Sequence, residues 1–201
     1  MSSEIYRRAV HGRRDMSSLM VHLTRDDRGD CEGWYMEGFS AKKNFRLIAK
    51  QKCIRAYKPH CLHRHKLRHL REDVQNAFKV ACFTETPLHE LDHLTKLIPG
   101  RKHRLAAYGY VFRRDFLIGE GAQQVTYINE FDPFNGLRGS YDKIFDLAAH
   151  RNFKEVSWRM LPFISTMRDN YDYSWEREWR VVGELKFKFR DLEAIRKPAL
   201  P

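Results

Sequence analysis

The stretch WEREWRVVGELKFKF, residues 175–189, has the clearest strand pattern in the chain. From Glu178 to Phe189, apolar and polar side chains largely alternate, which is the two-residue period of a half-buried strand. The expected apolar face consists of Trp179, Val181, Leu185, Phe187 and Phe189. Glu178 and Arg180 have the opposite parity, and Gly183 is expected to mark a bulge or a bend. We therefore predict one long strand whose first residue is a carboxylate.

Further short apolar or alternating runs predict strands at residues 19–23, 79–84, 107–112 and 124–129. Helices are expected at residues 40–51, 70–77, 142–150 and 155–167. Ser40 is the expected N-cap of the first helix, and Pro162 is expected to kink the last one. Strands that cluster around helices without strict βαβ alternation are typical of an α+β fold. With 201 residues and no internal repeat, the chain is expected to form a single domain over residues 1–201.

The composition predicts a folded protein without a membrane-spanning segment. The chain is 42% hydrophobic and 31% charged, so it has enough apolar material for a core. It lacks an apolar run near the roughly 18 residues of a membrane span, and its N-terminal residues lack the hydrophobic core of a secretory signal. The 4 cysteines are spread out without a disulfide framework. This spacing favours a reducing compartment, and the cytoplasm is the default expectation.

The net charge of +11 is unevenly distributed. Residues 1–80 contain 18 basic and 9 acidic side chains, whereas residues 81–201 contain 19 and 17. From Gly38 to Arg71 there are eleven basic residues and no acidic one. Positive side chains in such a run repel one another unless a polyanion binds them, so we expect this stretch to bind nucleic acid. A solvated surface, an acidic protein partner and membrane lipid are the alternatives.

The expected nucleic-acid contacts are Lys42, Lys43, Arg46, Lys50, Arg64 and Arg68. Three of them, Lys42, Arg46 and Lys50, recur every four residues and therefore form one stripe on a helix.

Part of this basic stretch is rich in histidine and is expected to be an insertion at about residues 57–77. Metal-competent side chains crowd in and beside it, namely Cys53, His60, Cys61, His63, His65 and His69. Because no C-x₂-C pair is present, zinc is the lesser alternative. Histidines among lysines and arginines more often extend a phosphate-binding surface, so no metal site is predicted.

Three short elements carry polar groups suited to chemistry. In residues 21–24 (VHLT), His22 and Thr24 share one side of a strand, and residues 82–87 (CFTETP) run from a strand into a polar turn. Residues 175–180 place Glu176 and Glu178 at the N-terminal end of the longest expected strand. A carboxylate near a histidine and a hydroxyl can steer sugar hydroxyls and stabilise cationic character at the anomeric carbon. The structural alternatives are a His–Thr hydrogen-bonded pair and a surface network of salt bridges.

The sequence lacks other common active-site signatures. It has no Walker loop, no G-x-G-x-x-G after a strand, no G-x-S-x-G elbow and no H-E-x-x-H. A magnesium nuclease centre would require several acidic side chains to lie close together. The spacing of the acidic residues in this sequence does not by itself indicate such a cluster. The candidates for such a centre are Asp115, Glu120, Asp132 and Glu178.

Taken in order, these elements resemble the AbiGi-type abortive phage-resistance proteins. Members of that family show an H-x-T start, a C-F-x-x-x-P-L turn, a Y-G-x-x-x-x strand and an E-R-E-W-R ending. The matching segments here are residues 21–24, 47–48, 53–54, 80–88, 108–112 and 175–180. The match covers most of the chain, with no counterpart for residues 57–76 and 131–169. Each motif is short, and their order makes the resemblance specific.

The H-x-T opening and the late strand-borne glutamate are also similar to the ADP-ribosyltransferase fold, particularly to DarT-type enzymes that modify nucleic-acid bases. This resemblance implies a split antiparallel sheet with flanking helices, and NAD as the substrate in a cleft between the His22 and Glu178 strands. It implies that His22 binds a ribose hydroxyl of NAD, with Thr24 beside it. Glu178, or alternatively Glu176, would hold the nicotinamide ribose and stabilise the oxocarbenium-like transition state.

The same resemblance implies further contacts to NAD. Tyr108 or Tyr110 would stack on the nicotinamide. Arg113, Arg114 or Arg180 would meet the pyrophosphate.

The leading expectation is a cytoplasmic phage-defence or toxin-type mono-ADP-ribosyltransferase that transfers ADP-ribose from NAD to nucleic acid, RNA or DNA. The alternative is a non-catalytic nucleic-acid-binding or antitoxin module of an abortive-infection system, because some family members are described as antitoxins. A cognate toxin or antitoxin is the protein partner expected for such a module, and no membrane contact is expected.

Overall fold

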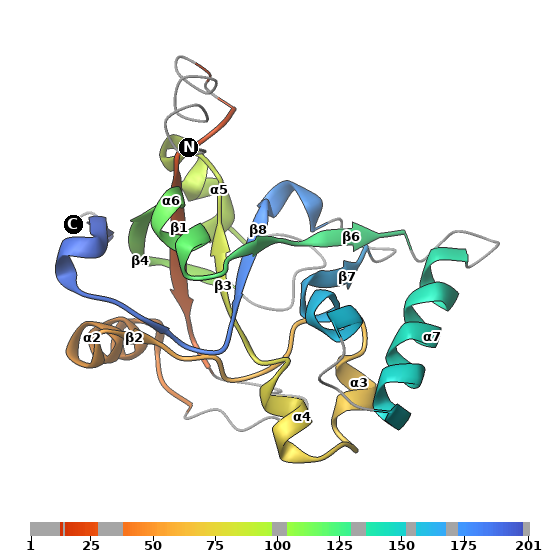
Figure 1. Cartoon of the computed structure of the whole chain (residues 1–201). Coiled ribbons are helices and arrows are strands. Elements are labelled where there is room, and N and C mark those ends of the chain that lie inside the picture. Colours follow the sequence, from red (N-terminus) through yellow and green to blue (C-terminus); the bar gives the residue numbers. More distant parts are fainter. Residues whose placement is uncertain are drawn as a thin grey trace.

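The computed structural model describes residue 13 and residues 15–27, 38–97, 104–129, 136–151, 156–167 and 173–198. Its centre is a six-stranded sheet in which every neighbouring pair is antiparallel (Figure 1). The strand order is β10 (Leu192–Arg196), β4 (Leu105–Arg113), β1 (Leu19–Arg25), β3 (Val80–Thr84), β8 (Glu178–Val182) and β5 (Gln123–Gln124). Helices lie between these strands in the chain, so the architecture is mixed and agrees with the expected α+β class.

The six strands form one sheet, but β1 and β3 are joined by a single registered pair, and we call this weakly joined place the split. β1 pairs with β4 at six positions and β3 pairs with β8 at five, but β1 and β3 share only the pair Val21–Thr84. Next to that pair, Nδ1 of His22 donates a hydrogen bond to the carbonyl oxygen of Cys82 over 2.9 Å. A side chain therefore stands where backbone ladder bonds would otherwise join the two strands, and the sheet opens there.

Cross-strand register determines which side chains share a face of the sheet. On one face, Met20, Phe112 and Trp179 belong to the main apolar core. On the other face, Val21 and Leu23 pack with two buried leucines of α5 (Leu91–Thr95), which follows the 3₁₀ turn η1 (Leu88–Glu90). Because Val21 is opposite Thr84, and Thr84 is opposite Glu178, these three residues share the second face.

The helix α2 (Ala41–Gln51) covers the first face and has the predicted boundaries. The hydroxyl of Ser40 accepts a hydrogen bond from the backbone N–H of Lys43 over 3.3 Å, which confirms Ser40 as the N-cap. Phe45 is buried and stacks on Tyr110. The helix α6 (Arg114–Gly119) directly follows β4 and adds Leu117 to the same core.

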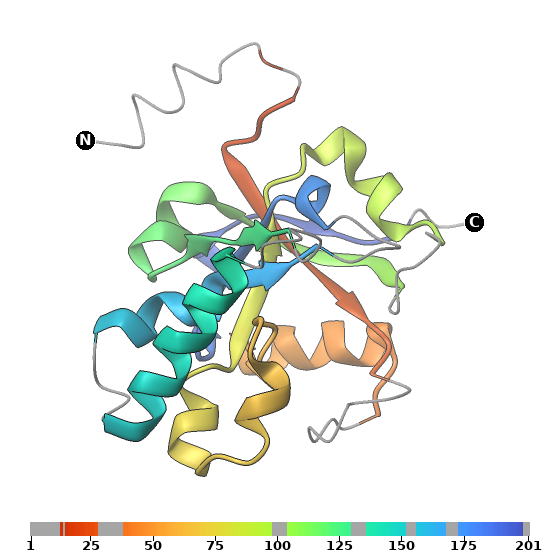
Figure 2. The ribbon, with the colours of Figure 1, turned by 90° about the vertical axis from the view of Figure 1, so that its right-hand side faces the viewer.

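Two segments of the chain form a second, smaller core. The first contains α3 (Arg64–Leu67) and α4 (Glu72–Asn76), and the second contains α7 (Gly136–Arg151) and the 3₁₀ helix η2 (Val156–Phe163). Both views place α3, α4 and α7 together at one end of the molecule (Figures 1 and 2). The buried members are Cys61, Leu67, Val74, Phe78, Phe145, Trp158 and Leu161. We call residues 57–78 together with α7 and η2 the accessory layer.

Two short sheets complete the fold. β2 (Cys53–Ile54) pairs antiparallel with β9 (Leu185–Lys186), and β6 (Thr126–Ile128) pairs parallel with β7 (Ile164–Thr166). Two 3₁₀ turns lie near the C-terminal end, η3 (Ser174–Glu176) before β8 and η4 (Phe189–Asp191) before β10. None of the helices within the described residues is long and apolar enough to cross a bilayer.

Three expectations about secondary structure were wrong. The bend expected at Gly183 is confirmed by its φ of 81°, but it ends β8, so the single strand expected at 178–189 is interrupted before β9 and Phe189 is 50% exposed. The helix expected at 155–167 is a 3₁₀ helix that becomes β7 immediately after Pro162-Phe163. The single strand expected at 124–129 is two short strands in different sheets.

Gly109 of β4 pairs with Leu23 of β1 and leaves no room for a side chain. A Cβ atom at this position would be 2.8 Å from the carbonyl oxygen of His22 and 2.9 Å from Cδ2 of Leu23. We expect Gly109→Ala to lower the free energy of unfolding by about 1–3 kcal/mol, because overpacking forces backbone and side chains apart. Urea unfolding measures this, with Gly119→Ala as the control, since a Cβ there meets nothing within 4 Å. Equal stability of the two variants would contradict the prediction.

Candidate active site

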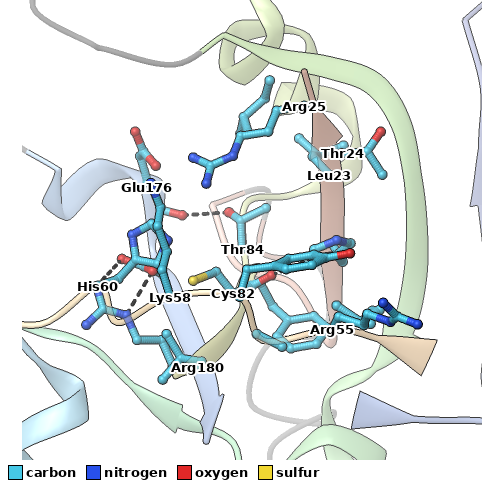
Figure 3. Close-up of a pocket in the computed structure, with 18 of the residues that line it drawn as sticks. Leu23, Thr24, Arg25, Arg55, Lys58, His60, Cys82, Thr84, Glu176 and Arg180 are labelled. Atoms are coloured by element: carbon cyan, nitrogen blue, oxygen red, sulfur yellow. Dashed lines mark hydrogen bonds and ion pairs between the residues drawn. The ribbon is translucent and has the colours of Figure 1, made fainter. Parts of the chain in front are cut away.

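A cavity of about 840 Å³ opens at the split in the sheet. Its lining comes from β1, β3 and β8, from α2, and from the accessory layer (Figure 3). His22, Thr84 and Glu178 all line this cavity although they are far apart in the sequence. The volume lies within the roughly 300–1,000 Å³ of typical small-molecule sites.

Glu178 is fixed in the cavity wall by two side chains. Nε and Nη2 of Arg180 donate to its two carboxylate oxygens, both over 2.9 Å, and the Tyr127 hydroxyl donates to Oε2 over 2.5 Å. Burial would raise the pKa of Glu178, but the ion pair with Arg180 and these hydrogen bonds hold it below its ordinary value. The carboxylate is therefore ionised at neutral pH and can accept from a ligand hydroxyl or stabilise positive charge.

Arg180 connects this carboxylate to the accessory layer. Its side chain is only 2% exposed, and Nη1 donates to the carbonyl oxygen of Pro162 in η2 over 2.8 Å. Each guanidinium nitrogen thus has an acceptor, as a buried charge requires. The alternative of a solvated surface network at this position is wrong for Glu178 and Arg180, whose side chains are 15% and 2% exposed.

His22 is neutral and offers one acceptor to the cavity. The carbonyl oxygen of Cys82 can only accept, so Nδ1 of His22 carries the hydrogen in that bond. Burial lowers the pKa of His22 to about 4, so Nε2 is unprotonated at neutral pH. An unprotonated Nε2 can accept a hydrogen bond from a hydroxyl of a bound ligand.

Thr24 lines the same cavity as His22. The residue is 3% exposed, its hydroxyl donates to the carbonyl oxygen of Tyr108 over 3.2 Å, and it lies on the opposite side of β1 from Arg25 (Figure 3). A second hydroxyl in the lining is that of Thr84, which donates to the carbonyl oxygen of Glu176 over 2.6 Å. Glu176 also lines the cavity, so both candidate glutamates are present there.

Several residues expected to contact NAD lie outside the cavity lining. Tyr110 is fully buried, stacks on Phe45 and donates its hydroxyl to the Phe45 carbonyl oxygen, so it has no free ring face. Tyr108 packs on the same phenylalanine. Arg113 lies near Asp115, and Arg114 pairs with Glu85, both at the far end of β4. Of the arginines expected at the pyrophosphate, Arg180 alone is in the lining.

The basic stretch divides into an exposed part and a part in the cavity. The exposed side chains are Lys42, Lys43, Arg46, Lys50, Lys52, Arg55, Arg68 and Arg71, of which Arg55 also lines the cavity. Arg55, Lys58 and Arg64 line the cavity, and Lys58 is only 3% exposed. Thus the stripe on α2 faces solvent as expected, while Arg64 belongs to the cavity wall.

Sequence reasoning missed Tyr127, Lys58 and His60 as cavity residues. The sequence pattern that could have indicated Tyr127 is its alternation with polar neighbours on a short strand. The backbone of Lys58 and Pro59 pairs with Lys79 and Val80 at the start of β3, and this long-range pairing places Lys58 and His60 in the wall. No local pattern in the sequence reveals such a pairing.

Among the residues that the structure describes, no group of three or more histidine, cysteine, aspartate or glutamate side chains could hold a metal ion. Of the metal-competent residues of the accessory layer, Cys61 is buried in its core and His63 stacks on Phe145, whereas His60 and His65 line the cavity. Of the four acidic residues considered for a magnesium centre, Asp132 lies outside the described residues.

Comparison of the chain with protein-family models, curated proteins and solved structures gives no significant match. The cavity geometry therefore carries the functional argument.

Proposed function

We propose that the chain is a mono-ADP-ribosyltransferase of abortive phage defence, related to the AbiGi-type and DarT-type proteins, that transfers ADP-ribose from NAD to nucleic acid. The observation that carries this proposal is the split between β1 and β3, which brings a neutral His22 and an ionised Glu178 into one cavity with a cationic wall. The split antiparallel sheet with flanking helices supports the transferase-like fold.

In this reaction the bond between C1′ of the nicotinamide ribose and the nicotinamide nitrogen breaks, and nicotinamide leaves with the bonding electron pair. A nucleophilic atom of the nucleic acid forms the new bond to C1′ and loses its proton. The ionised carboxylate of Glu178 accepts a hydrogen bond from a ribose hydroxyl and stabilises the oxocarbenium-like transition state. Nε2 of His22 accepts from a second ribose hydroxyl. Glu176 is the candidate to take the proton, because Glu178 already has its carboxylate bonded to Arg180 and Tyr127.

The test is incubation with NAD labelled in the adenylate moiety, together with RNA, DNA and protein acceptors. We expect label on nucleic acid and release of nicotinamide. Label on none of the acceptors, without nicotinamide release, would reject the proposal.

A second candidate function is supported by the same carboxylate. Both oxygens of Glu178 are bonded within the protein, as in a structural ion pair. A non-catalytic nucleic-acid-binding or antitoxin module would bind nucleic acid or a partner toxin in a salt-dependent way and consume no NAD. Binding without nicotinamide release would therefore favour this second function.

The exposed stripe of α2 leads to a prediction about nucleic-acid binding. Replacing Lys42, Arg46 and Lys50 together by glutamine is expected to weaken binding and to reduce the slope of log K against log salt by about two to three, since each neutralised phosphate contributes about 0.7–0.9. NAD consumption is expected to persist, because none of the three lines the cavity. Filter binding over a salt series measures the slope.

A charge-matched control for that experiment is the triple glutamine variant of Lys143, Arg159 and Arg190, which are all exposed. An unchanged slope in the α2 variant, or an equal loss in the control, would show that α2 is not the contact surface.

A further inference from the structure

The cavity lining carries more positive than negative charge. It contains six guanidinium or ammonium groups, from Arg25, Arg55, Lys58, Arg64, Arg138 and Arg180. The carboxylates of the lining are those of Asp27, Glu176 and Glu178. Arg180 is bonded to Glu178, and Arg138 lies 3.8 Å from Asp142 of the accessory layer. The lining as a whole therefore contains six cationic side chains and three carboxylates.

Four of these cations converge on one histidine. Burial, followed by the positive charges of Arg25, Arg180, Lys58 and Arg64, lowers the pKa of His60 well below its ordinary value. These residues come from four parts of the fold. Arg25 is on β1, Arg180 is on β8 and Arg64 begins α3. Lys58 precedes Pro59, which forms an isolated bridge with Lys79 just before β3. Figure 3 shows Arg25, Lys58, His60 and Arg180 in the cavity wall, with Glu176 beside them.

Cations from separate elements repel one another, and the fold holds them together through contacts made elsewhere. The guanidinium group of Arg180 is fixed by Glu178 and by the carbonyl oxygen of Pro162, and the backbone of Lys58 is fixed by the pairing beside β3. Such a preorganised set of cations stabilises an anion that binds among them. The free energy needed to bring the like charges together has already been offset by other contacts of the folded protein. Guanidinium groups suit phosphate in particular, since they donate two parallel hydrogen bonds to its oxygens.

We propose that Arg25, Lys58, His60 and Arg64 form a phosphate-binding subsite of the cavity. The subsite deepens the proposed function, and it rests on that function for the source of the phosphate, which is either the pyrophosphate of NAD or a backbone phosphate of the nucleic acid. Arg113 and Arg114, which were expected to bind the pyrophosphate, cannot belong to this subsite. They lie at the C-terminal end of β4, whereas Arg25 pairs with Leu105 at the other end of that strand. Most of the subsite comes from residues 57–64, so the accessory layer supplies the phosphate site and the central sheet supplies His22 and Glu178.

The experiment uses inorganic pyrophosphate as the probe and isothermal titration calorimetry as the measurement. We expect Lys58→Met and Arg64→Gln each to weaken pyrophosphate binding by about tenfold or more, since each removes a charge-assisted hydrogen bond to the anion. Arg68→Gln is the matched control, because Arg68 is exposed, lies one helical turn after Arg64 and is outside the lining. It is expected to change the affinity less than about twofold. Arg25→Gln, on a different element, replaces any variant whose thermal unfolding shows that it fails to fold.

A second readout is the imidazole NMR signal of His60, assigned with His60→Gln. A bound anion offsets the neighbouring cations, so pyrophosphate is expected to raise the pKa of His60. Unchanged affinity in the folded Lys58, Arg64 and Arg25 variants, or an equal loss in Arg68→Gln, would overturn the subsite. A His60 signal that does not respond to saturating pyrophosphate would also overturn it.

Competition distinguishes the two sources of phosphate. Displacement of pyrophosphate by NAD assigns the subsite to the donor, and displacement by a short 5′-phosphorylated oligonucleotide assigns it to the acceptor. Displacement by neither would overturn its assignment as a substrate subsite.

Because pyrophosphate binding requires no turnover, a chain that binds pyrophosphate through Lys58 and Arg64 but releases no nicotinamide would reject the proposed function and leave the phosphate site intact.

Discussion

Replacing Glu178 with alanine is expected to reduce ADP-ribosyl transfer by at least about 100-fold and to lower the free energy of unfolding by about 3–5 kcal/mol. The loss of transfer follows from removing the carboxylate that stabilises the oxocarbenium-like transition state, an effect for which single electrostatic groups commonly account for about 10²–10³ in rate. The loss of stability follows because Arg180 is 2% exposed and would remain buried without its carboxylate partner. Labelled-NAD transfer and urea unfolding measure the two effects.

A double variant separates the chemistry from the folding. In Glu178→Ala combined with Arg180→Met both buried charges are absent, so stability is expected to recover to within about 1–2 kcal/mol of the unaltered chain while transfer stays lost. Glu193→Ala is the control, because Glu193 is exposed on β10 and its removal is expected to change stability by less than about 0.5 kcal/mol. Undiminished transfer by folded Glu178→Ala would remove Glu178 from the mechanism and favour the non-catalytic module.

Acidification is expected to destabilise the protein before its carboxylates titrate. Burial lowers the pKa of His22 and of His63 from 6.5 to about 4. Between these two values the unfolded chain takes up protons that the folded chain does not, so stability is complete above pH 6.5 and is lost as the pH falls toward 4. For the fully buried His63 the loss is about 3 kcal/mol over this interval, and His22 acts in the same direction.

His63 is held neutral by its surroundings. Its Nε2 donates to Oδ1 of Asp142 over 3.1 Å, its ring stacks on Phe145, and Nδ1 is buried without a hydrogen-bond partner among the described residues. Asp142 and Lys66 act on its charge in opposite directions, and burial is the largest influence.

Unfolding free energies measured in urea at pH 7, 6, 5 and 4.5 test this prediction. Glu178 has a pKa below its ordinary value, so its contribution is lost only at lower pH than this series covers. His63→Leu is expected to make the pH dependence shallower, whereas the exposed His69→Gln is expected to leave it unchanged. A free energy that stays level from pH 6.5 to 4.5 would contradict the assigned burial of these histidines.

Local patterns predicted much of the secondary structure. Ser40 and the periodicity after it gave the bounds of α2, and short apolar runs located β1, β3 and β4. These predictions succeeded because an N-cap, a helical stripe and an alternating strand each depend on residues a few positions apart. The prediction at 155–167 was wrong because helical propensity was outweighed by tertiary context: Pro162 and the pairing of β7 with β6 continue the chain as a strand.

The candidate site shows the limit of the same reasoning. Alternation placed Glu178 and Arg180 on one side of their strand, but it could not say that this side is buried. Burial arises because η2 covers β8 and supplies the Pro162 carbonyl oxygen to Arg180. Likewise, Tyr110 has an aromatic ring on which a nicotinamide could stack. Only its contact with Phe45 shows that this ring is part of the core.

The sequence by itself determined the strand elements with their parity, the helix α2 with its exposed cationic stripe, and the uneven distribution of charge. These features follow from spacing and composition. Only the tertiary structure decided that β1 and β3 separate after the single pair Val21–Thr84, and that Lys58, His60 and Arg64 enter the opening. The physical reason is that a strand's register and a cavity's lining depend on contacts between residues distant in the chain, which no local periodicity records.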